Sequence, residues 1–445
     1  MDEKKELFNF AATIFHLLFS SGETNVCKFI IKYGFEKLGK DSSFVDIYNI
    51  KLDVIKYKGE ILNGDYLNSI LFLLKLDNES ADNAILIEYI KNQKRSNCSL
   101  CDGNDVLIFP TFHSLDHYYY GYENLSSIFN NLYFIDTSIF GNSEFIVNNF
   151  YFDFNQYENQ LEVAFVPYPY DEKIHEEAKN GLLLEKEGLE SAQQLFIERI
   201  EKAIKRFTNP NNIPSLVFTP EIVGSRLLDE KIKLIARNNK ALIGILCPSY
   251  HKRTGDKTFN EATLFVNEDR TSYPCAIRKF VQASISNTIE QINTDRINIT
   301  IINVRNIGKV MFIICRDFLS DVFSKIAKMI LPDFVVVQCF TPRLKHFDTD
   351  LRCICKYNSC VMIGNSCSAI KKSNFGDSIL MYGFKNDCIN KEDINVIYSN
   401  KKIDSGCIDN CLNNKDCSII LRINVTESTR VSHPTNILTI EKEEF

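Results

Sequence analysis

The 445-residue chain has no tryptophan, only five methionines, and no apolar run approaching the ~18 residues that a membrane-spanning helix needs. Because Asn, Lys, Ile and Phe are abundant, we attribute the missing tryptophan to coding bias rather than to function. Basic residues form no block, and 51 Lys and Arg against 57 Asp and Glu leave a net charge of −6. These absences argue against a membrane span and against a nucleic-acid-binding surface.

The cysteines are numerous but show no pairing pattern. Their number, 15, is odd, and they are scattered through apolar runs, which is typical of reduced thiols rather than of a disulfide framework. The N-terminus has a short apolar stretch after a charged start and no small-residue cleavage pattern, so we expect a buried helix over residues 8–19. These features predict a cytoplasmic protein, long enough for a sizeable core and for more than one domain.

Cys315 occupies the most informative position of the chain. An apolar, β-branched run over residues 310–314 ends at this cysteine, and the polar pair Arg316 and Asp317 follows. Apolar residues then recur at helical spacing, so we expect Cys315 on a strand-to-helix turn. At such a turn, helix N-terminal amides can lower the pKa of the thiol and bind an oxyanion. The alternative is a small apolar residue that ends a buried strand, a common place for a free cysteine.

Two further motifs precede this turn. Glu221 follows an apolar run that is interrupted by Pro220, and Lys279 follows a predicted hairpin within residues 257–281. The setting of Cys315 has the pattern G-K-V-x-x-x-I-C-x-D. In this order, the three motifs resemble those of the nitrilase, or carbon-nitrogen hydrolase, superfamily, over about residues 161–424.

The resemblance implies an α-β-β-α sandwich and assigns roles to individual residues. Cys315 would be the nucleophile, Glu221 the general base, and Lys279 an oxyanion donor together with the backbone N–H of Arg316. Glu290 would position the substrate, as a second glutamate does in many members; the alternative is a solvated residue in a polar segment. An arginine after the nucleophile would place a guanidinium at the mouth and favour an acidic substrate. The reaction needs no cofactor.

The N-terminal region lies outside this resemblance. We expect a mainly helical domain over residues 1–157 and the nitrilase-like domain over residues 158–445. The recognisable metal spacing of the chain is C-x2-C-x11-H-x3-H, formed by Cys98, Cys101, His113 and His117. This spacing predicts a structural zinc knuckle, whose four protein ligands would leave no open catalytic position. Because Pro110 interrupts the segment that would become a helix, chance spacing in a cysteine-rich chain is the alternative.

The sequence therefore predicts an amidohydrolase that acts on a small-molecule amide in preference to a nitrile. The resemblance also implies a homo-oligomer, because members of the superfamily often dimerise. The alternative is a nitrilase-like scaffold whose N-terminal domain docks a protein partner, by analogy with nitrilase-like domains beside reverse transcriptases in some bacterial antiviral systems. An intact set of Glu221, Lys279 and Cys315 favours the enzyme.

Overall fold

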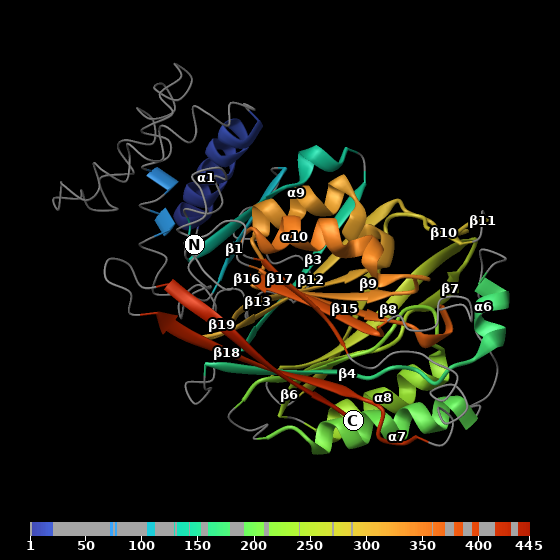
Figure 1. Cartoon of the computed structure of the whole chain (residues 1–445). Coiled ribbons are helices and arrows are strands. Elements are labelled where there is room, and N and C mark those ends of the chain that lie inside the picture. The colour runs from blue at the N-terminus through green and yellow to red at the C-terminus, as the bar shows by residue number, and fades with distance from the viewer. Residues whose placement is uncertain are drawn as a thin grey trace. The chain divides into compact units, whose positions relative to one another are not determined.

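The computed structural model of the chain is drawn in Figure 1. The described residues are 2–20, 72–73, 76–77, 105–111, 129, 131–141, 143–152, 159–178, 191–208, 213–239, 241–268, 271–285, 288–357, 359–369, 378–385, 394–399, 414–428 and 435–445. The four candidate zinc ligands, Cys98, Cys101, His113 and His117, lie outside these ranges, so the zinc knuckle stays a prediction. None of the described helices is long and apolar enough to cross a membrane.

The chain divides into two compact units. Unit 1 contains Met1–Asn142 and Lys325–Leu331, and unit 2 contains Ser143–Ser324 and Pro332–Phe445. The sequence placed a boundary after residue 157, but strand β3 (Glu144–Phe152) belongs to unit 2. The reason is that β3 pairs in parallel with β12 (Arg296–Val304) along its whole length.

The described part of unit 1 packs a helix against two strands. Its elements are α1 (Asp2–Ser20), β1 (Val106–Pro110), β2 (Leu132–Asp136) and the 3-10 helix η3 (Thr137–Phe140). The helix predicted over residues 8–19 is confirmed. Phe15 of α1 stacks on Phe134 of β2, with ring centroids 4.6 Å apart. The mainly helical character of residues 1–157 stays a prediction, because most of residues 21–104 are outside the described ranges.

Unit 2 alternates strands and helices. Its further strands are β4 (Gln160–Phe165), β5 (Ser215–Phe218), β6 (Leu242–Leu246), β7 (Tyr250–Thr254), β8 (Lys257–Glu268), β9 (Thr271–Arg278), β10 (Ser284–Ile285), β11 (Thr288–Ile289), β13 (Gly308–Ile314), β14 (Phe334–Cys339), β15 (Cys360–Asn365), β16 (Leu380–Lys385), β17 (Ile394–Tyr398), β18 (Ile419–Ser428) and β19 (Thr435–Glu444). Its helices are α6 (Glu172–Ala178), α7 (Ser191–Lys205), α8 (Arg226–Asn238), α10 (Asp348–Cys355) and the 3-10 helices η4 (Cys315–Leu319), η5 (Leu344–Phe347) and η6 (Cys367–Ala369). Helix α9 (Asp321–Ile330) begins in unit 2 and ends in unit 1.

Fifteen of the described strands form one sheet. The strand order is β17-β16-β15-β14-β13-β12-β9-β8-β6-β5-β4-β18-β19, with β3 beside β12 and β7 beside β8. Each half contains three adjacent parallel strands, β13 to β15 in one and β4 to β6 in the other. Crossovers that contain helices connect parallel neighbours, as such strands require.

The sheet folds back so that its two halves face each other. A side chain on Gly364 of β15 would overlap the rings of Phe165 in β4 and Phe218 in β5, so backbone and rings meet closely here. Helix α10 covers the outer side of one half, because Leu351 packs onto Gly383 of β16. Helices α7 and α8 cover the other half (Figure 1). The layers follow the order helix, strand, strand, helix, which confirms the predicted α-β-β-α sandwich.

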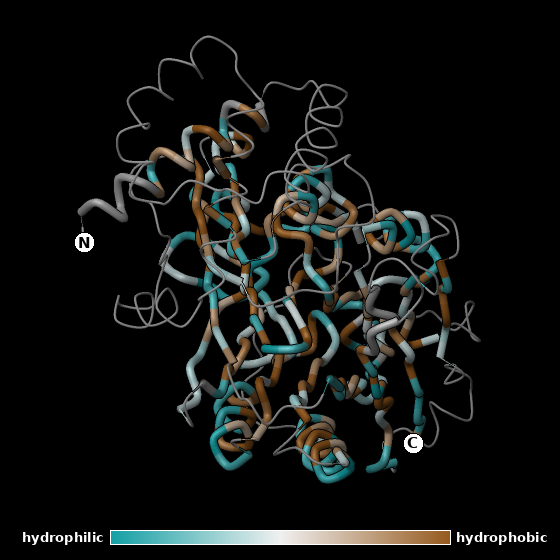
Figure 2. The backbone as a smooth tube through the Cα atoms, turned by 90° about the vertical axis from the view of Figure 1, so that its left-hand side faces the viewer, coloured by the Kyte–Doolittle hydropathy of each residue, from teal (hydrophilic) through white to brown (hydrophobic). Residues whose placement is uncertain are grey.

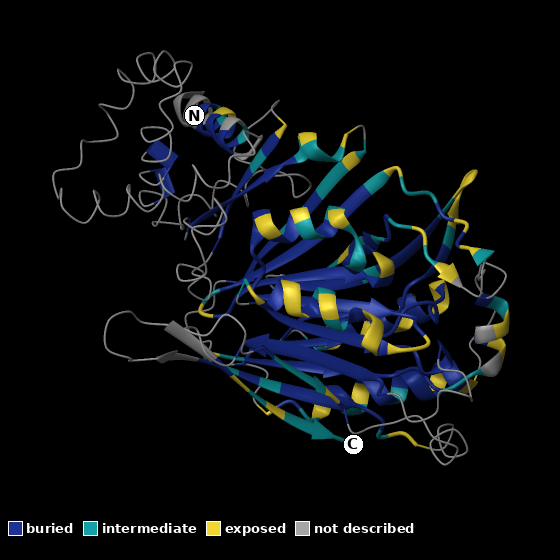
Figure 3. Ribbon diagram, turned by 45° about the horizontal axis from the view of Figure 1, so that its top comes forward, coloured by how far each residue is buried: buried dark blue, intermediate teal, exposed yellow. Residues whose placement is uncertain are grey.

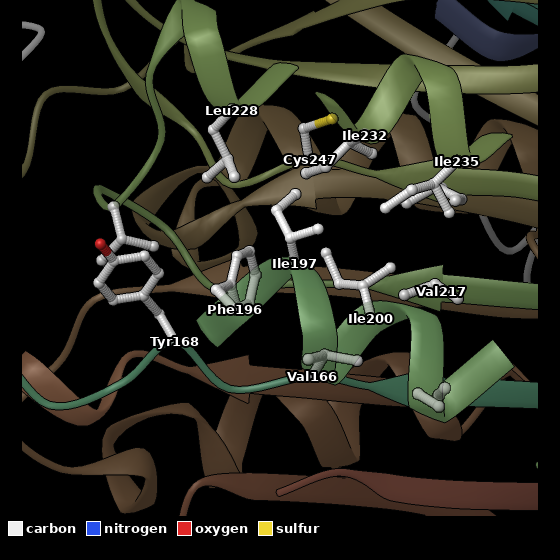
Figure 4. Close-up of a cluster of buried hydrophobic side chains, with 14 of the residues drawn as sticks. Val166, Tyr168, Phe196, Ile197, Ile200, Val217, Leu228, Ile232, Ile235 and Cys247 are labelled. Atoms are coloured by element: carbon white, nitrogen blue, oxygen red, sulfur yellow. The ribbon is translucent and has the colours of Figure 1, made fainter. Parts of the chain in front are cut away.

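The helices are amphipathic because each has one packed side. Figure 2 shows α7 and α8 end-on at the bottom, carrying both hydrophilic and hydrophobic residues. Their buried side chains include Phe196, Ile200, Leu228 and Ile232, which pack over Val217 of β5 (Figure 4). The strands between the helix layers are almost entirely buried, whereas exposed residues gather on the helices and edge strands (Figure 3). The interior between these layers holds the polar residues that are described next.

Candidate active site

Cys315 begins a 3-10 turn at the end of a fully buried strand. All residues of β13 are buried, and the chain turns sharply because Cys315 has a φ of 45°, in the left-handed region. The predicted α-helix starts later than expected, since Ser320 caps α9 by accepting a hydrogen bond from Phe323 N at 3.1 Å. Helix amides therefore begin beyond the turn rather than at Cys315. The cysteine itself is 7% exposed.

Lys279 lies between two glutamates in the interior of unit 2. It directly follows β9, while Glu221 comes shortly after β5 and Glu290 directly follows β11. Lys279 Nζ is 2.7 Å from Glu221 Oε1 and 2.9 Å from Glu290 Oε2. All three side chains are at most 1% exposed, so the solvated alternative for Glu290 does not hold. Three strands that are separate in the sequence thus bring one cation and two carboxylates together.

Glu290 is saturated with hydrogen bonds. Its Oε1 accepts from His251 Nε2 at 2.9 Å and from Asn260 Nδ2 at 2.8 Å. Its Oε2 accepts from the backbone N–H of Ala283 at 3.0 Å, in addition to its contact with Lys279. Burial raises the pKa of Glu290, but the charge of Lys279 and the bond to His251 outweigh burial and lower it. A carboxylate with this many donors is held in its ionised form.

Glu221 is different, because only one of its oxygens is engaged. Oε1 accepts from Lys279 Nζ at 2.7 Å and from Asn260 Nδ2 at 2.9 Å. Oε2 is buried and accepts no well-aligned hydrogen bond from the described residues. The carboxylate interacts with the thiol of Cys315, and burial raises its pKa although Lys279 opposes the shift. Glu221 is therefore the carboxylate of this pair that can take up a proton.

The thiol of Cys315 is neutral at rest. Burial raises its pKa well above the usual range, and the charge of Glu221 raises it further. Lys279 and the backbone N–H of Phe340 act in the opposite direction without outweighing burial. The helix amides of α9 begin too late to act on this thiol, and the lowering effect of Lys279 is smaller than the effect of burial. A proton acceptor beside the sulfur is then needed before the sulfur can attack an electrophile.

Lys279 keeps its proton despite complete burial. Burial lowers the pKa of a lysine, but Glu221 and Glu290 together outweigh this effect and raise it well above the usual value. The charge of Cys315, when it is ionised, acts in the same direction. A fixed ammonium group next to the thiol can stabilise negative charge that develops there.

Asp317 connects the turn of the cysteine to the segment that follows the lysine. Its Oδ1 accepts from Val281 N at 2.7 Å and from Phe280 N at 3.0 Å, and it is fully buried. Burial raises its pKa well above the usual range, although Lys279 and the two amides lower it. The residue is part of the quoted motif, yet the sequence assigned it no role. Its bonds hold Lys279 and Cys315 in register.

Arg316 lies apart from these buried groups. Its side chain is exposed, in contrast to its neighbours Cys315 and Asp317. Its charge acts on Asp350 of α10, where it lowers a carboxyl pKa that burial raises. His251 and Asn260 were also not predicted as site residues. They carry no local motif, and their position depends on the pairing of β7 with β8, in which they are directly opposite.

No protein-family model and no curated protein matches this chain. Among solved structures, the chain is similar to an amidase of the nitrilase superfamily from Nesterenkonia, with 11% identity, a TM-score of 0.34, and coverage of 46% of this chain and 76% of the other. It is also similar to Nit3 of Saccharomyces cerevisiae, with 15% identity, a TM-score of 0.36, and coverage of 57% and 94%. A third is XC1258 from Xanthomonas campestris, a CN-hydrolase superfamily protein, with 15% identity, a TM-score of 0.34, and coverage of 57% and 97%. At these values, similarity assigns no activity to this chain.

Proposed function

We propose that this chain is a carbon-nitrogen hydrolase that cleaves a small-molecule amide, in preference to a nitrile, through a thioester on Cys315. One observation carries the proposal. Glu221 has one oxygen held by Lys279 and Asn260, and its second oxygen is buried and accepts no well-aligned hydrogen bond from the described residues. The same carboxylate neighbours a thiol that burial keeps neutral. This arrangement suits proton transfer from sulfur to carboxylate during attack.

In the first half of the reaction, the sulfur of Cys315 attacks the carbonyl carbon while its proton passes to Glu221. A C–S bond forms, and the carbonyl oxygen becomes an oxyanion that Lys279 and the backbone N–H of Arg316 stabilise. The C–N bond then breaks, and the amine leaves with the proton that Glu221 returns to it. The product is a thioester between Cys315 and the acyl group.

In the second half, Glu221 takes a proton from water, and the resulting hydroxide attacks the thioester carbon. The C–S bond breaks, the acid is released, and the proton returns to the sulfur of Cys315. A buried carboxylate can serve both steps because burial raises its pKa, which makes it a better proton acceptor than a carboxylate in water.

The test compares the wild type with Cys315→Ala and Glu221→Gln after brief exposure to a panel of small amides, with intact mass as the readout. We expect an acyl adduct on the wild type and none on Cys315→Ala. Glu221→Gln should form the adduct roughly 100-fold more slowly or worse, because a positioned base typically contributes 10²–10⁴ in rate.

Alkylation with iodoacetamide provides the internal reference. Cys353 of α10 is exposed, and its reactivity sets the rate expected of an ordinary surface thiol. Cys353→Ala is the matched control and should leave the adduct on Cys315 unchanged. Absence of any acyl adduct on the wild type, across the panel of amides, would contradict the hydrolase and favour the scaffold alternative.

A further inference from the structure

Two carboxylates of the same kind compete for one lysine in this site. Both Glu221 and Glu290 lie within 2.9 Å of Lys279 Nζ, and both are excluded from solvent. Like charges this close cannot both remain ionised unless other groups compensate one of them. If the thiol proton moved to Glu290 instead, it would end on a carboxylate that is already bound on both oxygens. Something in the fold must therefore distinguish the two glutamates.

His251 makes the contact that distinguishes them. It lies on β7, is 2% exposed, and places Nε2 2.9 Å from Glu290 Oε1. Asn260 does not discriminate, since its Nδ2 donates to Glu221 at 2.9 Å and to Glu290 at 2.8 Å. Lys279 also contacts both glutamates. Lys279 and Asn260 thus bond both glutamates, whereas the hydrogen bond of His251 Nε2 goes to Glu290.

We propose that His251 is a positioning residue for the hydrolysis put forward above. By bonding Glu290, it keeps that carboxylate ionised and leaves Glu221 as the group that receives the thiol proton. Its hydrogen bond also neutralises part of the charge of Glu290, which weakens the attraction between Glu290 and Lys279. The ammonium group can then stabilise negative charge on the sulfur and on the oxyanion. This inference rests on the proposed function.

Several other charged groups lie near His251. On its own strand, Lys252 Nζ binds Glu261 Oε1 of β8 at 2.7 Å, and Arg278 of β9 binds the second oxygen of Glu261 at 2.6 Å. His251 also lines a cavity of about 560 Å³ between α8 and the strands. The charged side chains that share this cavity are Arg226, Asp229, Glu230, Lys233, Lys252 and Arg253. Glu290 remains the carboxylate to which the imidazole is bonded.

The test follows the rate of Cys315 alkylation by iodoacetamide against pH in the full chain. His251→Phe removes the donor, and we expect the rate at pH 7 to fall about tenfold, with the profile displaced to higher pH by about one unit. The rate falls and the profile moves to higher pH because Glu290, without the donor, attracts Lys279 more strongly. The ammonium group then stabilises the thiolate of Cys315 less. His251→Gln retains an N–H donor near the position of Nε2 and should restore most of the rate.

Two further variants separate positioning from packing. In a Glu290→Gln background the competing charge is absent, so adding His251→Phe should no longer displace the profile. His346→Gln changes an exposed histidine of η5 and should match the wild type throughout. The inference would be overturned if His251→Phe displaced the pH profile as far in the Glu290→Gln background as in the wild type. It would also be overturned if His251→Phe alone had the wild-type profile.

These outcomes differ from those that test the proposed function. If no acyl adduct forms on wild-type Cys315, the hydrolase proposal fails, and this inference, which rests on it, fails as well. If Cys315 is reactive in the wild type and His251→Phe leaves its pH profile unchanged, only the role of His251 is refuted. If the phenylalanine variant fails to fold, His251→Gln still tests the inference, because it keeps a polar side chain at this buried position.

Discussion

Asp317 links the turn that carries the nucleophile to the segment that follows the lysine. It bonds the backbone amides of Phe280 and Val281, the two residues after Lys279, while lying two residues after Cys315. Loss of such an acceptor leaves one buried and one partly buried donor unpaired, and an unpaired buried donor typically costs roughly 1–3 kcal/mol. Stability and reactivity are therefore coupled at this residue.

We predict that Asp317→Ala lowers the free energy of unfolding by about 2 kcal/mol or more and slows Cys315 alkylation about tenfold, because Lys279 loses its anchor. Asp317→Asn should be much milder, since its side-chain oxygen can still accept from both amides. Urea unfolding and the alkylation rate measure the two effects. Asp321→Asn, at an exposed carboxylate of α9, is the control and should change neither.

The residues that could be predicted are those next to strand ends. Glu221, Lys279 and Cys315 each follow an apolar strand that the sequence marks clearly. In the structure Lys279 contacts Glu221 and Glu290, and the thiol of Cys315 interacts with Glu221. His251 and Asn260 could not be found in this way. They meet Glu290 only because β7 and β8 pair in one register, and a shift by one residue would turn both side chains to the other face.

At the scale of elements, the strand-to-helix connection after β13 carries backbone strain. Cys315 has a φ of 45°, a conformation that costs a residue with a side chain roughly 1–2 kcal/mol relative to glycine. The sequence predicted a turn here but placed the helix immediately after it. The 3-10 helix η4 intervenes because Ser320 is in an extended conformation and caps α9 instead. The pattern of apolar residues does not show whether the chain forms a 3-10 turn or an α-helix directly after Cys315.

We predict that Cys315→Gly is more stable than Cys315→Ala by about 1 kcal/mol, because glycine adopts positive φ without steric cost. Urea unfolding of the two variants gives the difference directly. The matched control is Cys339, a buried cysteine in the middle layers on β14, where Gly should be the less stable replacement. An alanine variant at 315 as stable as the glycine variant would mean that the turn carries no strain.

At the scale of the whole molecule, one carboxyl joins the outer helix layer to the sheet. Asp229 of α8 is 9% exposed and accepts a hydrogen bond from Thr263 Oγ1 of β8 at 2.9 Å. Burial raises its pKa to about 7, although the bonds from Thr263 and Cys247 oppose the shift. The folded chain therefore binds a proton that the unfolded chain, with an aspartate pKa of about 3.9, has already lost.

Stability should accordingly fall as the pH rises from about 4 to about 7, because the native state holds more protons than the unfolded state in this window. The full effect of this group is at most about 4 kcal/mol, three pKa units at 1.36 kcal/mol each. Asp229→Asn keeps an acceptor for Thr263 and should flatten this part of the profile. Urea midpoints at several pH values measure it. Glu230→Gln, whose side chain is 61% exposed, should leave the slope as in the wild type.

The layered architecture of unit 2 could be predicted because strands and helices alternate from residue 161 onward. The membership of β3 could not, since its partner β12 begins 144 residues after residue 152 and no local signal links them. The same holds for β18, which pairs with β4 across more than 250 residues. Pairings of this kind depend on the complete fold rather than on local preference.

The pairing of β4 between β5 and β18 has a consequence for biosynthesis. At roughly 5–20 residues per second, a ribosome needs about 15–50 s to pass from β4 to β18. Throughout that interval one edge of β4 lacks the partner that covers it in the finished molecule. An open edge of apolar residues is a template for wrong pairing. Until β18 has been made, this edge of β4 therefore stays open to wrong pairing.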